Sequence, residues 1–184
     1  MKNIICLSIL SVTILFGSLN QAFAGEDRAG NIGASYGLSV PDYAGSTSRT
    51  IVGFQGTAKL GSEWGLGGYY LSSSKTESGT ALTGDFTYQL YGVKGTYHFE
   101  GEARGVYFGG MLGVSKIHAG TADTSPTHYG ALAGYDKMFG DMFSVGGEFS
   151  YVMVGASSTT LSGANVNLNS FNALNFSVGI KLWF

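Results

Sequence analysis

The sequence predicts an all-β protein, an eight-stranded antiparallel up-and-down transmembrane β-barrel that follows a cleaved N-terminal signal peptide. Three observations predict it: an apolar leader, eight segments in which apolar residues alternate with small or polar ones, and connections that are long and short in turn. The chain also has 30 glycines and 14% aromatic residues, but only 12% charged residues, where soluble proteins have about 25%. Few charges and many aromatic residues indicate a chain that meets something other than water.

The N-terminal residues have the organisation of a signal peptide. Lys2 precedes an apolar run from Ile4 to Phe16, and Ala22 and Ala24 form the A-x-A pattern of a cleavage site. A membrane-spanning helix is the rival interpretation, but it needs about 18 or more apolar residues, and this run is shorter and contains hydroxyl side chains. We therefore expect export and cleavage.

Cleavage would divide the chain into a signal peptide, residues 1–24, and one barrel domain, residues 25–184. It would remove Cys6, the only cysteine, so the exported chain would have no thiol for a disulfide, a metal site or a nucleophile. Nine basic and 12 acidic residues would remain, a net charge of −3 without a polybasic patch. Nucleic acid is therefore not an expected partner.

Alternation with a period of two predicts the strands. In "NIGASYGLSV", Ile32, Tyr36 and Leu38 share one face, while Gly33 and Ser35 share the other. Equivalent segments are expected at about 31–40, 52–60, 64–73, 86–99, 106–114, 129–135, 143–153 and 175–184.

Two of these segments are ambiguous. In the third, the neighbouring Tyr69 and Tyr70 point to opposite faces, so its register stays open. In the fourth, Tyr88 and Leu90 break the parity of the later residues, which indicates a bulge or a wrong boundary.

Strand length and connection length both favour a membrane. Strands of about 10 to 15 residues exceed the usual 5 to 6 of globular proteins, but they match the about 9 to 11 that a tilted strand needs to cross a bilayer. Outer-membrane barrels have short periplasmic turns and long extracellular loops. The expected extracellular loops are at about 41–49, 75–84, 117–126 and 155–169, and the short turns lie near 61–63, 100–104 and 140–141.

Charged residues within the strands lie on the polar face only. A lysine or arginine facing lipid at the bilayer midplane costs about 2 to 4 kcal/mol, and the interior of an eight-stranded barrel is about wide enough for side chains to fill. Since buried charges need partners, we expect an interior ion-pair network. Its members would be Lys94, Asp136, Glu148 and Lys181.

Other interpretations of these charges stay open. Lys59 shares their face, and Lys59 and Asp136 could point to water at the ends of the barrel. The network could also gate a narrow pore.

The last segment, "FSVGIKLWF", carries a family resemblance together with the leader and the eight alternating segments. The chain resembles the small outer-membrane β-barrel family of the outer membrane protein A barrel and outer membrane protein X type. The resemblance implies location in the bacterial outer membrane, among its lipids and lipopolysaccharide. It also implies that the barrel-assembly machinery reads the last strand as an insertion signal. That signal would consist of Phe176, Val178, Ile180, Leu182 and Phe184.

The leading functional hypothesis is a structural or surface-interaction role through the extracellular loops. These loops are rich in Ser, Thr and Gly, which suits solvated display but identifies no ligand. We expect no enzymatic activity, no catalytic residue, no cofactor and no metal site.

Two alternatives remain. An outer-membrane enzyme of lipid or peptide substrates could use a trio from His118, Asp123, Ser125 and His128, and the two histidines could be a metal pair. However, no spacing rule connects these residues, and an acyltransferase would need an apolar interior pocket, whereas the inner faces are mostly Gly, Ser, Thr and charged residues. A soluble periplasmic ligand-binding barrel would instead turn its apolar face inward.

Overall fold

The structure of the chain is a computed structural model, and it describes residues 29–42, 48–73, 86–99, 105–119, 122–140, 142–161 and 164–184. The expected signal peptide, with Ala22 and Ala24, and the expected loop 75–84 lie outside these residues. Within the described ranges, no helix is long and apolar enough to cross a membrane.

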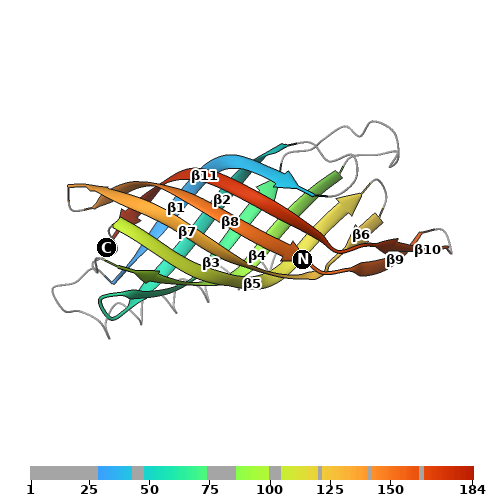
Figure 1. Cartoon of the computed structure of the whole chain (residues 1–184), viewed down its shortest axis with the longest axis horizontal. Coiled ribbons are helices and arrows are strands. Elements are labelled where there is room, and N and C mark those ends of the chain that lie inside the picture. Colours follow the sequence, from blue (N-terminus) through green and yellow to red (C-terminus); the bar gives the residue numbers. More distant parts are fainter. Residues whose placement is uncertain are drawn as a thin grey trace, which may run out of the picture.

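Eight long antiparallel strands form a closed barrel (Figure 1). Each pairs with the long strands before and after it, and the first, β1, pairs with the last, β11. The predicted fold class is confirmed. The long strands are β1 (Gly30–Pro41), β2 (Arg49–Leu60), β3 (Trp64–Ser73), β4 (Phe86–His98), β5 (Gly105–Ala119), β7 (Thr127–Phe139), β8 (Phe143–Val154) and β11 (Phe171–Trp183).

The predicted alternation decides which face of each strand points outward. Tyr36 on β1 and Val178 on β11 are cross-strand partners, and both are 64% exposed on the outer surface. In β3, whose register the sequence left open, Tyr69 points inward and is buried, while Tyr70 lies on the outer face. The outer surface of the described strands is therefore an apolar belt, as contact with lipid requires.

Strand β4 has no bulge. Its residues pair in unbroken register with β3 and β5. Tyr88 and Leu90 are 1% and 0% exposed, so they are inward residues that happen to be apolar. The expectation of a bulge or a wrong boundary was wrong because the inner face is not polar along its whole length.

The two ends of the barrel differ as expected. Short turns close one end, and Gly61 and Gly140 in two of these turns have positive φ angles of 82° and 66°, which favour glycine. The long connections leave the opposite end, which we call the loop side; the end with the short turns is the turn side (Figure 1).

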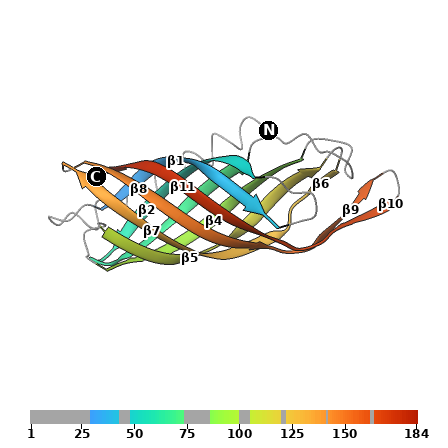
Figure 2. The ribbon, with the colours of Figure 1, turned by 45° about the horizontal axis from the view of Figure 1, so that its top comes forward.

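Two expected loops contain additional strands. Strand β5 continues through Ile117–Ala119, and Ile117 is 0% exposed in the interior. Strand β6 (Ala122–Thr124) pairs back onto these three residues. Within the expected loop 155–169, β9 (Ser157–Leu161) and β10 (Ala164–Leu168) form a hairpin that extends beyond the barrel (Figure 2).

The interior has two layers. The turn-side layer is charged, and the loop-side layer is an apolar core. Our expectation that the inner faces are mostly small, hydroxyl or charged was therefore wrong for the loop-side half. This core contains Tyr69, Tyr88, Leu90, Met111, Ile117, Leu132, Val152, Val154 and Phe171.

Candidate functional site

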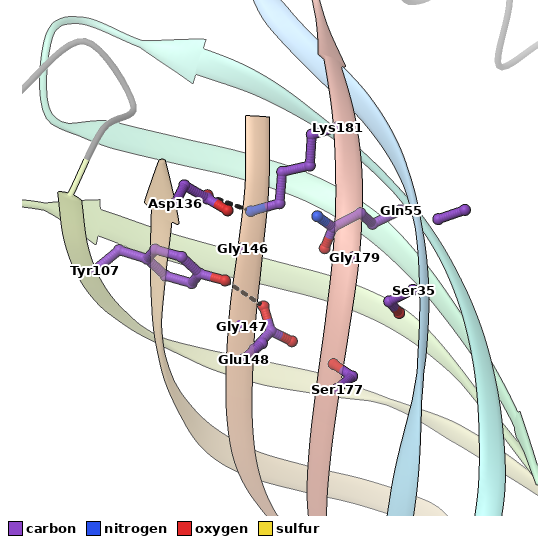
Figure 3. A pocket seen from close by; sticks show the side chains of 11 residues that line it. Ser35, Gln55, Tyr107, Asp136, Gly146, Gly147, Glu148, Ser177, Gly179 and Lys181 are labelled. Atoms are coloured by element: carbon purple, nitrogen blue, oxygen red, sulfur yellow. Dashed lines mark hydrogen bonds and ion pairs between the residues drawn. The ribbon is translucent and has the colours of Figure 1, made fainter. Parts of the chain in front are cut away.

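The charged layer contains two ion pairs, and the first joins β4 to β8 across the barrel. The Lys94 Nζ donates a hydrogen bond to Glu148 Oε2 at 2.8 Å. The Tyr107 hydroxyl donates to the same oxygen at 3.0 Å (Figure 3). The Lys94 side chain is only 3% exposed, so the Glu148 carboxylate supplies the countercharge that this buried ammonium needs.

The second ion pair joins β7 to β11. Lys181 Nζ donates to Asp136 Oδ2, and the same ammonium lies 4.7 Å from the centre of the Tyr107 ring (Figure 3). Tyr107 therefore contacts both pairs, through its hydroxyl and through its ring face. The four residues that the sequence singled out as interior charges lie in one layer, in the pairs Lys94–Glu148 and Lys181–Asp136.

A cavity of about 20 Å³ lies beside these pairs. It is lined by Asp136, Glu148, Lys181 and Gln55 among others (Figure 3). A buried site needs about 10 to 15 Å³ to hold a water molecule. Asp136 Oδ1 is buried and has no hydrogen-bond partner in the described part of the chain, so a water molecule in this cavity would satisfy it. The volume suits water and not an organic ligand.

Glycines make room for each interior charge. The cross-strand partner of Lys94 is Gly67, that of Glu148 is Gly134, and that of Asp136 is Gly146. A Cβ atom on Gly146 would lie 2.0 Å from Asp136 Oδ1. The pairing of each of these charges with a glycine on the neighbouring strand depends on strand register, so the charges and the glycines alone do not predict it.

Two further polar side chains occupy the turn-side end. Trp183, whose inward parity is unusual for an interface aromatic residue, is 2% exposed, and its Nε1 donates to Ser144 Oγ at 2.8 Å. Lys59 also points inward and is 9% exposed. Asp136 is 1% exposed, so it does not extend into open water at the end of the barrel.

In the loop-side half, a buried serine, histidine and tyrosine are linked by hydrogen bonds. Ser115 Oγ lies 2.9 Å from His128 Nδ1, and the Tyr69 hydroxyl contacts His128 Nε2. A Ser–His contact resembles a nucleophile and its base. However, Ser115 and His128 are both 0% exposed, so no substrate can reach the hydroxyl, and the contacts satisfy buried polar groups.

The structure separates the residues of the hypothetical catalytic trio. His118 Nδ1 lies 2.7 Å from Asp123 Oδ1 at the exposed β5–β6 hairpin, whereas His128 is inside the barrel. His118 and His128 are therefore no metal pair. Within the described ranges, no group of three or more His, Cys, Asp or Glu side chains could hold a metal ion.

The seam between β1 and β11 is fastened at both ends. On the loop side, the Asp42 carboxylate accepts hydrogen bonds from the backbone N–H of Asn172 at 2.6 Å and from its side-chain amide at 2.7 Å. On the turn side, the backbone groups of Gly30 and Phe184 exchange two hydrogen bonds of 3.1 Å. The first and last strands are thus joined over their full length.

We expect the loop-side contact to persist at neutral pH and to open in acid. Both hydrogen bonds from Asn172 favour the ionised carboxylate and lower the pKa of Asp42 below its ordinary value of 3.8. A lowered folded-state pKa contributes stability above the ordinary pKa, and that contribution disappears as the pH falls through the folded value. The Asn172 amide proton resonance should therefore shift only below about pH 4, and Asp42→Asn should abolish this titration. A midpoint above the ordinary value would contradict the assignment.

The residues of the expected insertion signal lie on the last strand. Phe176, Val178 and Ile180 are exposed on the outer face of β11, Leu182 is partly exposed on the same face, and Phe184 follows the strand at the turn-side rim.

The fold was compared with known proteins. No protein-family model matches the chain, and no curated protein sequence matches it. Solved structures do match. Neisserial surface protein A has 16% identity and a TM-score of 0.65, with 85% of this chain and 97% of that chain covered. Ail, the attachment invasion locus protein of Yersinia pestis, has 15% identity and a TM-score of 0.55, with 86% and 99% covered.

The fold is that of the small outer-membrane β-barrels. A second structure of Ail, in complex with the heparin analogue sucrose octasulfate, matches with 16% identity and a TM-score of 0.52, covering 84% of this chain and 99% of Ail. At these identities the similarity concerns the fold, and the fold that the sequence resemblance implied is confirmed.

Proposed function

We propose that this protein is an integral barrel of the bacterial outer membrane that acts through its extracellular loops and does not conduct through an open pore. The observation that carries the proposal is the division of the described strands into an apolar outer belt and a filled interior. Tyr36, Val178 and Ile180 are more than 60% exposed on the outer face, whereas two ion pairs, Lys94–Glu148 and Lys181–Asp136, lie inside.

The loop side provides the surface for interaction. The β9–β10 hairpin, the β5–β6 hairpin and the Asp42–Asn172 contact all lie at this end. Backbone hydrogen bonds of a hairpin hold it above the barrel, where another macromolecule can reach it. Neisserial surface protein A and the attachment invasion locus protein Ail are named for such surface roles, which supports the same class of function here.

Membrane location and loop function need separate tests. We expect the protein to sediment with outer-membrane vesicles and to migrate differently in detergent gels before and after heating, because a closed barrel resists unfolding. Recovery in the soluble periplasm would contradict the location. Deleting residues 157–168 and joining the ends with two glycines should leave this migration unchanged and abolish adhesion to host cells or to other bacteria. Unchanged adhesion would exclude the β9–β10 hairpin as the contact surface.

The heparin-analogue complex of Ail does not predict a polyanion ligand for this chain. Arg49 at the loop-side start of β2 is buried at 4% exposure. In the sequence, the expected extracellular loops and the residues next to them contain four other acidic residues, Asp42, Glu77, Asp85 and Asp123, and two other basic residues, Lys75 and Lys116. Four acidic and two basic residues repel a sulfated polymer.

We therefore expect the detergent-solubilised protein to pass through a heparin column at physiological ionic strength. The Glu77→Lys, Asp85→Lys double variant should be retained, because it changes these loop charges from four acidic and two basic to two acidic and four basic residues. Retention of the unaltered protein would contradict this expectation and would favour a sulfated polysaccharide as its partner.

We also propose that the last strand directs insertion by the barrel-assembly machinery, among lipid and lipopolysaccharide. Deleting Phe184 removes an exposed terminal aromatic residue and both of its backbone hydrogen bonds to Gly30. We expect a severalfold lower surface level, measured by immunoblotting of outer-membrane fractions. Phe184→Ala removes the aromatic side chain but keeps the two backbone hydrogen bonds to Gly30. Comparison of the two variants therefore distinguishes the role of the side chain from the role of the β1–β11 seam. An unchanged level for both variants would contradict this role.

A further inference from the structure

The turn-side half of the interior contains more positive than negative charge. Lys94 and Lys181 are paired with Glu148 and Asp136, respectively. The remaining cation is Lys59, which is nine-tenths buried. Its ammonium group has no hydrogen bond or ion pair to any residue in the described part of the chain, and the nitrogen keeps some contact with solvent at the rim.

Lys59 lies beside a second polar group that lacks a partner. It is the penultimate residue of β2, and His98 is the last residue of β4, so both lie at the turn-side rim. His98 is 7% exposed, and its Nδ1 is buried without a hydrogen-bond partner in the described ranges. Its Nε2 lies 3.4 Å from Thr96 Oγ1.

The backbone register places these groups around one space. Lys59 pairs with Gly65, and Gly65 pairs with Thr96 on the next strand. Gly65 contributes no side chain, and a Cβ atom there would lie 2.7 Å from Thr96 Oγ1. The Lys59 side chain therefore faces Thr96 and His98 across a glycine.

The chemistry of this cluster suits an anion. It offers an ammonium group and, when Nε2 accepts the hydroxyl proton of Thr96, an Nδ1–H donor on His98. Lys59, Lys94 and Lys181 are all close enough for their charges to act on the His98 ring. Lys94 and Lys181 already have carboxylate partners, so a bound negative charge would balance Lys59 and would supply the missing partner of His98.

We propose that Lys59 and His98 form a binding site for a small oxyanion at the turn-side end of the barrel, with Thr96 fixing the tautomer of the His98 ring. Two sources have this chemistry: a free inorganic oxyanion, and the carboxylates of Glu26 and Asp27, which precede β1 in the sequence and lie outside the described residues. Both would bind through the same donors.

Histidine resonances provide a direct test in the full barrel. The chain has three histidines, so ¹⁵N-histidine labelling in detergent micelles gives one reporter in the site and two controls, His118 and His128. Titration with sodium sulfate at constant ionic strength should shift the His98 ring signals saturably and leave His128 unchanged. Lys59→Met should weaken the apparent affinity at least about tenfold, because one charge-assisted hydrogen bond is lost.

Control variants separate the site from general charge and folding effects. Lys137 is an exposed lysine on the outer face at the same end of the barrel, so Lys137→Met should titrate like the unaltered protein. Lys59→Arg should retain the response, and unchanged His128 signals verify that each variant is folded. If only the Glu26→Gln, Asp27→Asn variant responds to sulfate, the site exists and the chain's own carboxylates occupy it. If neither form shows a saturable His98 shift, or if Lys59→Met responds normally, the proposal is wrong.

Discussion

Replacing Glu148 with leucine is expected to lower the free energy of unfolding by about 3 to 5 kcal/mol, since it removes one partner of a buried ion pair. The Lys94 side chain is 3% exposed, and the variant would leave its ammonium group without a countercharge. It would also remove the acceptor of the Tyr107 hydroxyl. Urea unfolding in lipid vesicles, followed by the fluorescence of Trp64 and Trp183, measures the change.

A double-mutant cycle distinguishes the ion pair from simple loss of packing. The Lys94→Met, Glu148→Leu variant removes both charges and should recover most of the lost stability, because two apolar side chains can replace a buried pair at little cost. Tyr107→Phe removes one hydrogen bond and should cost only about 1 kcal/mol. If Glu148→Leu unfolds like the unaltered protein, the carboxylate is hydrated and does not stabilise the interior.

Replacing Gly92 with alanine is expected to destabilise the barrel by about 1 to 3 kcal/mol or more, as overpacking of a filled interior does. Gly92 points inward from β4 and pairs with Gly113 on β5. A Cβ atom on Gly92 would lie 2.1 Å from the backbone oxygen of Leu112. Because the obstructing atom belongs to the backbone, the two strands must move apart before the methyl group fits.

A matched control lies on the same strand. Gly95 points outward, and a Cβ atom there would approach its nearest neighbour, the Gly65 oxygen, at 3.9 Å, an ordinary contact. Gly95→Ala should therefore fold normally, and the ratio of heat-modified to unmodified protein on detergent gels should fall only for Gly92→Ala. Equal behaviour of the two variants would show that the inward glycine is not required for barrel closure.

Much of the fold follows from local periodicity. Successive residues of a strand point to opposite faces, and lipid excludes charge from one of those faces. The alternation around Tyr36 and Ile180 therefore predicts the outward direction of both residues, which the structure has. The same rule places Lys94 and Glu148 on the inner face before any contact is known.

Local periodicity fails where both faces are apolar or small. Tyr88 and Leu90 are inward residues of the loop-side core. If every apolar strand residue is expected to face lipid, these two residues look like a break in the alternation. Ile117 lies in β5, pairs with Tyr88 and is buried in the core, although the sequence around it resembles a loop. Whether an apolar side chain faces lipid or the core depends on strand register, which neighbouring strands determine together.

The candidate sites show the same division. Sequence alone placed four charges on the inner face without pairing them, and the structure pairs Lys181 with Asp136. It grouped His128 with His118 as residues of one expected loop, whereas the barrel puts His128 inside, beside Tyr69 and Ser115.

The sequence by itself determined the number of barrel strands, the lipid-facing surface and the inward direction of Lys94, Asp136, Glu148 and Lys181, because each depends on a period of two and on the cost of charge in lipid. Only the tertiary structure decided which charges meet, where the apolar core lies, and that Lys59 lies across Gly65 from Thr96. These contacts join strands that are distant in the chain. They depend on how the barrel closes and on which glycines leave space inside it, and no local pattern contains that information.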